Sequence, residues 1–145
     1  MRSADEIALA ARRPLEDRGY VEIRHNYSHG TFGDELVDFE RKTTLVRLLK
    51  DRGQWLVDLG PSEERLFNIE VWMGVLGATS VDDPPTAFGV QAAFVGSDLN
   101  RMESLILEDE FAVETDLENW RRNRFLRRST TFDFEPPDAG SSPAG

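Results

Sequence analysis

The clearest pattern in this chain is an alternation of apolar and polar residues that runs from Phe32 to Gly60. Successive side chains of a β-strand point to opposite faces, so the alternation predicts strands with one apolar face each. It predicts three strands, at residues 35–41, around 46–48 and at 54–59. Short polar turns separate them, so neighbouring strands are expected to pair as antiparallel hairpins.

A further strand is predicted upstream, at residues 20–26. Val21 and Ile23 are expected to lie on one face of this half-buried strand, and Glu22 and Arg24 on the other. The glycine-rich stretch that follows is read as a loop.

A short amphipathic helix is predicted near the start of the sequence, with Ser3 as its N-cap. Pro14 is expected to kink or end this helix, and Gly19 suits the position just after a helix end. One apolar stripe of small residues would face a sheet; it consists of Ile7, Ala8, Ala11 and Leu15.

Helical periodicity returns in the second half of the chain. A helix is predicted from Ser62 to about Leu76, and residues 86–108 form either one kinked helix or two short helices divided at Gly96-Ser97. Thr115 with a glutamate three residues later forms a capping box, which predicts the start of another helix.

These elements predict an α+β domain over residues 1–133. It has an N-terminal helix and an antiparallel meander of about four strands, covered on one face by the C-terminal helices. Residues 134–145 are rich in Pro, Gly and Ser and are expected to be a disordered tail.

Composition narrows the classes of function. The chain has 145 residues, no cysteine and a formal net charge of −10, which opposes binding to nucleic acid or to an anionic membrane surface and favours a basic partner. No run of ~18 apolar residues is long enough to cross a membrane. We therefore expect a cytoplasmic protein, as a monomer or homodimer, with a protein partner, no nucleic acid and no membrane.

Candidate chemistry is sparse. His25 and His29 are four residues apart, a spacing of ~6 Å on a helix but ~13 Å on an extended strand, so only a turn would let both bind one metal ion. A mixed site with Asp34 and Glu35 is conceivable. Ser28 lies beside both histidines without the motif of a nucleophile elbow. No catalytic, metal or cofactor residue is assigned.

Aromatic residues in loops beside acids are the better candidates, because they suit recognition of a basic protein surface. A run of acids also precedes a cluster of arginines at 121–128, and the two are expected to be solvated helix faces that can pair with each other. The candidate partner-binding residues are Tyr27, Phe32, Asp34, Glu35, Glu108, Asp109 and Glu110.

Four motifs follow one another in the first half of the chain. They are a strand start at Gly19-Tyr20, a Phe32-Gly33 pair before a strand, the D-R-G-Q hairpin within 47–55, and an amphipathic helix from about Phe67 to Leu76. In this order they resemble small bacterial α+β proteins of immunity-protein type. The resemblance implies an inhibitor that binds a toxin, and it assigns no residue a role.

The leading hypothesis is therefore a non-catalytic protein-binding domain, an immunity-like inhibitor that docks an acidic surface on a basic partner. One alternative is a small hydrolase or metal-dependent enzyme that uses the loop from His25 to Glu35. Another is a homo-oligomeric or accessory subunit that uses the strand at 20–26 or the arginine-rich helix as its interface.

Overall fold

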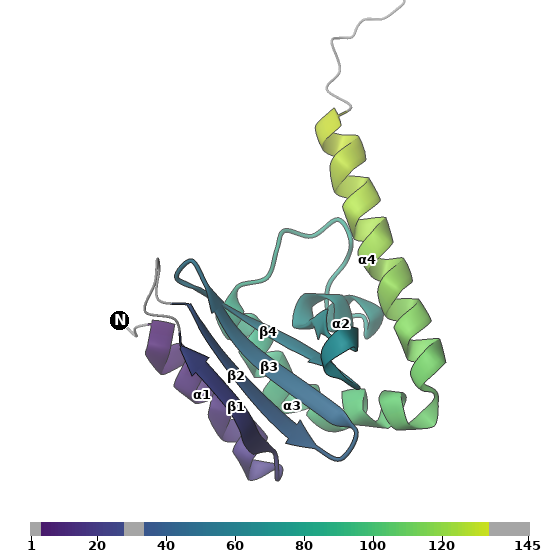
Figure 1. Cartoon of the computed structure of the whole chain (residues 1–145). Helices are drawn as coiled ribbons and strands as arrows, with labels where there is room; N and C mark the ends of the chain where they lie inside the picture. The colour runs from purple at the N-terminus through teal and green to yellow at the C-terminus, as the bar shows by residue number, and fades with distance from the viewer. Residues whose placement is uncertain (1–3, 28–33, 134–145) are drawn as a thin grey trace, which may run out of the picture.

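The computed structural model describes residues 4–27 and 34–133 (Figure 1). The elements are α1 (Ala4–Asp17), β1 (Val21–Tyr27), β2 (Glu35–Arg41), β3 (Thr44–Asp51), β4 (Gln54–Gly60), the 3-10 turn η2 (Glu63–Arg65), β5 (Phe67–Asn68), α2 (Ile69–Val75), α3 (Phe88–Glu108) and α4 (Glu110–Asp133).

The strands form one five-stranded sheet in the order β1-β2-β3-β4-β5, and every neighbouring pair is antiparallel. The predicted α+β class with an antiparallel meander is confirmed, and the short β5 adds an edge that the alternation did not reveal. The turn between β3 and β4 places Arg52 and Gly53 at φ of 55° and 82°, a left-handed pair typical of a tight hairpin.

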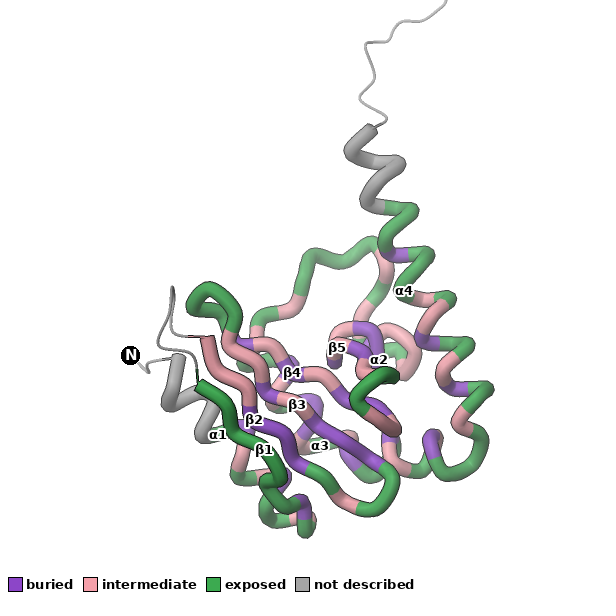
Figure 2. Tube along the Cα trace, viewed as in Figure 1, coloured by how far each residue is buried: buried purple, intermediate pink, exposed green. Residues whose placement is uncertain are grey.

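One face of the sheet packs on helices α1 and α3 and carries the core (Figures 1 and 2). Its inward side chains follow the register: Val37 lies opposite Leu48, which lies opposite Val57. The predicted covering of one face by helices is therefore confirmed. The completely buried apolar side chains, with no exposed surface, are Leu15, Phe39, Val46, Leu59, Ile69, Trp72, Leu99, Met102 and Leu117.

The opposite face carries a row of polar residues across all the strands. In register, Arg24 lies opposite Asp38, Asp38 opposite Arg47, Arg47 opposite Asp58, and Asp58 opposite Asn68. Asp38 is buried, with 1% of its surface exposed. Burial raises the pKa of the Asp58 carboxyl, and a hydrogen bond from Asn68 opposes that shift. Alternating charges in one row favour this register over any shifted one.

The turn η2 closes over this row. The carboxylate of Glu63 accepts a hydrogen bond from Arg24 at 3.1 Å and another from Arg47 at 3.0 Å. These bonds lower the pKa of Glu63. The arrangement joins the connection between β4 and β5 to the outer face of β1 and β3.

Helices α2 and α4 pack unusually closely. A Cβ atom added to Gly74 would lie 1.9 Å from the Trp120 ring, so only glycine allows this approach. Arg124 of α4 is buried and forms an ion pair with Glu70 of α2. Glu70 also accepts hydrogen bonds from the backbone nitrogen and hydroxyl of Thr86, at 2.9 and 3.1 Å. This polar network fixes α4 on the domain.

The N-terminal part differs from expectation in two places. Strand β1 is exposed along its whole length, with Val21 and Ile23 at 62% and 51% exposure, because it is the edge strand and the outer face above it has no helical cover. The register also shifts between Glu22 and Arg24, so the alternation breaks at a bulge. Helix α1 continues past Pro14 to Asp17 rather than ending there.

Helix boundaries in the second half also differ. Helix α2 begins at Ile69 with Asn68 as its cap, not at Ser62, because Phe67 first pairs with Leu59 as strand β5. Residues 88–108 form one helix without a break at Gly96.

Helix α4 begins at Glu110, so the capping box at Thr115 is not used. Instead, the Thr115 hydroxyl donates to the Phe111 carbonyl one turn back, at 2.9 Å. The expected N-cap Ser3 and the expected tail at 134–145 lie outside the described residues.

Candidate protein-binding surfaces

The residues chosen from the sequence do not form one site. Tyr27, Asp34 and Glu35 lie where β1 ends and β2 begins, whereas Glu108 and Asp109 lie at the junction of α3 and α4, at the opposite end of the molecule (Figure 1). Phe32 lies outside the described residues. Each group borders a separate hollow.

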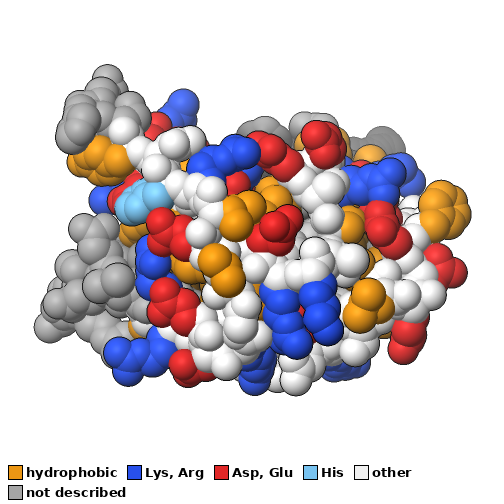
Figure 3. Space-filling view, turned by 60° about the horizontal axis from the view of Figure 1, so that its bottom comes forward, with side chains coloured by type: hydrophobic (Ala, Val, Ile, Leu, Met, Phe, Trp, Pro, Cys, Tyr) orange, Lys and Arg blue, Asp and Glu red, His pale blue; other side chains and the backbone are white. Residues whose placement is uncertain are grey.

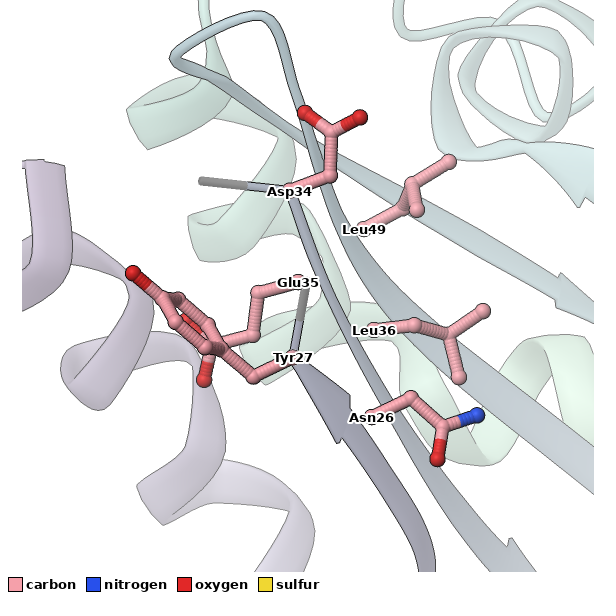
Figure 4. Close-up of a pocket in the computed structure, with 6 residues that line it drawn as sticks. All are labelled: Asn26, Tyr27, Asp34, Glu35, Leu36 and Leu49. Atoms are coloured by element: carbon pink, nitrogen blue, oxygen red, sulfur yellow. The ribbon is translucent and has the colours of Figure 1, made fainter. Parts of the chain in front are cut away.

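The first hollow has a volume of about 220 Å³ and is lined by Asn26, Tyr27, Asp34, Glu35, Leu36 and Leu49. Figure 4 shows Leu36, Leu49 and Asn26 on one side of the strands and Tyr27 with Glu35 on the other. The lining therefore wraps around the edge of the sheet and is shallow. Its apolar part consists of two leucines on the outer face.

The two acids of this hollow already have partners. Glu35 contacts the Nε2 atom of His25 at 2.5 Å, and Asp34 accepts the backbone N–H of Arg52 at 3.1 Å. Glu22 lies 3.8 Å from the other ring nitrogen of His25. These contacts tie the edge strand to β2 and to the next hairpin, so the carboxylates have a structural role.

The hypothesis of a metal site or catalytic loop at His25 gains little from this geometry. Among residues 4–27 and 34–133, no group of three or more His, Asp or Glu side chains is arranged to hold a metal ion. Ser28 and His29, which that hypothesis needs, lie outside the described residues.

The second hollow is larger, at about 310 Å³, and lies between α2, α3 and α4. Its floor is apolar and its rim is acidic. The lining residues are Val75, Leu76, Leu105, Ala112 and Val113 for the floor and Glu108, Asp109 and Asp116 for the rim. We call this site the acidic hollow.

The three rim carboxylates are not equivalent. Asp109 caps α4, because its Oδ1 atom accepts the backbone N–H of Ala112 at 3.0 Å. Within the described part of the chain, Glu108 and Asp116 take part in no ion pair. Glu110, the third acid selected from the sequence here, instead pairs with Arg65 outside the hollow. The rim therefore offers two carboxylates that have no cation of their own.

The sequence pointed to part of the rim but missed the floor. Leu105 of α3 and Val113 of α4 lie on the sides of their helices that pack against the core, and Val75 and Leu76 lie at the end of α2. Periodicity shows which face of a helix is apolar. It does not show that a hollow remains between three such faces after the helices have packed. Asp116 was one acid among several in a charged run.

The arginines at 121–127 do not pair as a group with the acidic run before them. Arg121 bonds Glu118 within α4 and lies with its guanidinium 5.0 Å above the Phe67 ring. Arg127 pairs with Asp82 of the connector before α3. With Arg124 on Glu70, the cluster mainly holds α4 against other elements.

Charge and hydrophobic groups are mixed on the rest of the surface that Figure 3 displays, with acids, bases and apolar side chains interspersed. The net charge is therefore not gathered into one broad acidic face there. No described helix is both long and apolar enough to span a membrane. A local feature such as the acidic hollow is a better candidate for recognition than overall charge.

Comparison with known proteins gives no further guide. No family model, no curated protein and no solved structure matches this chain.

Proposed function

We propose that this chain is a non-catalytic protein-binding domain, an immunity-like inhibitor that docks the acidic hollow on a basic partner such as a toxin. The observation that carries the proposal is an apolar floor bordered by Glu108 and Asp116, two carboxylates that have no ion pair in the described part of the chain. An apolar side chain flanked by Lys or Arg on the partner would fit both parts.

The chemistry of such a contact is well defined. The apolar anchor would give affinity by leaving water, and the flanking cations would meet carboxylates on the rim. Because rim charges act mainly on the association rate, binding should weaken as salt rises. The formal net charge of −10 would add long-range attraction for a basic protein.

The test is affinity capture from a bacterial lysate at low and moderate salt, with the bound proteins identified by mass spectrometry. Three baits are compared: the natural chain, the double variant Glu108→Gln/Asp116→Asn, and the control Glu64→Gln/Asp51→Asn. The control removes the same number of charges from exposed positions away from the hollow.

We expect one basic protein that the natural chain and the control retain and that the rim variant loses. With that protein purified, the rim variant should bind at least about tenfold more weakly, which corresponds to about 1.4 kcal/mol. An acidic partner, or one that the rim variant retains equally at low salt, would contradict the proposal.

A further inference from the structure

Helix α4 extends beyond the body of the domain at its C-terminal end (Figure 1). Buried and exposed residues alternate along the helix (Figure 2), because one side of it faces the body and the other faces solvent. The side toward the body carries the buried Val113, Leu117 and Arg124. The opposite side has no cover from any described element.

The uncovered side has large apolar groups at both ends. Phe111 is 80% exposed, Phe125 is 67% exposed and Leu126 is 51% exposed. With 3.6 residues per turn, Phe111, Thr115, Arg122 and Leu126 lie on one stripe directly away from the body. Exposed aromatic groups of this size on one helix face are typical of an interface.

Charge is also divided along α4. Its first half carries the acids Glu110, Glu114, Asp116 and Glu118, and its second half carries the arginines 121, 122, 124, 127 and 128. Most of these charges have partners within the chain, because Glu110 and Glu114 pair with Arg65, Arg124 with Glu70 and Arg127 with Asp82. Arg122 has no ion pair in the described part of the chain, and it lies near the outward stripe, as Glu118 does. A second α4 running antiparallel would place Arg122 near Glu118 of the first, whereas a parallel copy would place Arg122 beside Arg122. Charge therefore selects the antiparallel arrangement.

We propose that two copies of this chain associate through the outward stripe of α4, with the two helices antiparallel. The two-fold axis passes near Glu118 and Asn119. Phe111 of each copy then lies opposite Leu126 and Phe125 of the other, and Glu118 lies within one helical turn of Arg122 of the other. The apolar contacts lie at the two ends of the pair and the ionic contacts near its centre.

The two domain bodies do not compete for this space. Each body packs on the Val113 side of its own α4, so the bodies lie on opposite outer sides of the helix pair. The acidic hollow uses Ala112 and Asp116 on a flank of the helix rather than the outward stripe. The dimer surface is therefore separate from the proposed partner-binding surface.

The first test measures the mass of the full chain by sedimentation equilibrium up to about 1 mM, where a Kd of about 100 μM gives mainly dimer. We expect a dimer for the natural chain. Arg122→Glu should raise the Kd at least tenfold, and so should Phe111→Ser. Arg101→Glu, the same charge change on the exposed side of α3, is the matched control and should leave the Kd unchanged.

The charge contact has its own check. If Glu118 of one copy meets Arg122 of the other, the double variant Glu118→Arg/Arg122→Glu should recover most of the affinity lost by Arg122→Glu. Far-UV circular dichroism confirms that each variant retains its helices. A monomer at about 1 mM, or an equal effect of Arg101→Glu and Arg122→Glu, would overturn the proposal.

The second test determines whether the two α4 helices are antiparallel or parallel. The natural chain has no cysteine, so single cysteines report only the new contact. Asn119→Cys, near the axis, should cross-link to itself under mild oxidation, whereas Leu126→Cys should not. A mixture of Phe111→Cys and Leu126→Cys chains should cross-link with each other. Efficient self-linking of Leu126→Cys would indicate parallel helices and overturn the arrangement.

Discussion

The guanidinium of Arg47 binds the carboxylate of Asp38 through two hydrogen bonds, of 2.8 and 3.0 Å, between opposite residues of β2 and β3. The carboxylate is almost fully buried, although it lies on the face of the sheet that the helices do not cover. It is held between Arg47 and Arg24, and Glu63 binds both arginines from above. The outer face of the sheet is thus ordered by ionic contacts rather than by apolar packing.

Asp38→Asn should destabilise the fold by about 2–4 kcal/mol, because it removes the buried carboxylate that Arg24 and Arg47 share and leaves them only the more exposed Glu63. Chemical denaturation measures this change. Asp51→Asn, an exposed position on the next strand, is the control and should change stability by no more than about 0.5 kcal/mol. Equal effects of the two substitutions would show that the row of charges contributes nothing.

Gly74→Ala should be strongly destabilising, because the new methyl group would overlap the Trp120 ring. The expected loss is about 2–3 kcal/mol, measured by thermal or chemical unfolding. Gly89→Ala in α3 is a matched control, since a Cβ there has nothing within 4 Å. That substitution should instead stabilise the helix, by up to about 1 kcal/mol. The opposite order of the two effects would contradict the close packing of α2 on α4.

Burial and the hydrogen bond to Glu103 raise the pKa of Tyr20 well above its ordinary value of 10.0. The folded state then keeps a proton that the unfolded state loses, so stability should fall as the pH rises above that ordinary value. The free energy of unfolding should fall by about 1.4 kcal/mol per pH unit in that range. Tyr20→Phe should remove this part of the slope, and Tyr27→Phe provides a comparison at an exposed tyrosine. Parallel alkaline slopes for the natural chain and Tyr20→Phe would contradict the prediction.

Arg124→Leu should destabilise the protein by about 2–4 kcal/mol, because it leaves the partly buried Glu70 without its cation. The double variant Arg124→Leu/Glu70→Leu should lose less than the sum of the two single variants. Arg127→Leu removes an exposed ion pair with Asp82 and should cost less than about 1 kcal/mol. Denaturant titration of these four variants and the natural chain decides whether the buried network or the exposed pair holds α4.

The alternation of residues was enough to predict the sheet because each strand pairs with its neighbour along the chain. Val37, Phe39 and Val46 were placed correctly on the inner face by period alone. The same reasoning was wrong for Val21 and Ile23. A period of two residues indicates that two side chains lie on the same face of a strand, but it does not indicate whether another element covers that face.

The predicted starts of two helices were wrong for a different reason. Ser62 and Thr115 are both good capping residues, yet Asn68 and Asp109 provide the caps that the fold uses. Local sequence offers several starts, and tertiary contacts choose among them: Phe67 pairs with Leu59 before α2 can begin. The acidic hollow was only partly predictable, since its floor exists only after three helices have packed.

The meander order of the sheet also bears on how the chain folds. Since every strand pairs with the strand next to it in sequence, the sheet can grow by adding one hairpin at a time, and proteins with such local contacts fold rapidly. All five strands precede α3 and α4 in the chain, so during synthesis the sheet can form before the last helix leaves the ribosome. We expect the docking of α4 to be a late step. Because α4 is the last element in the chain, its outward stripe should meet a second copy only after the sheet has formed.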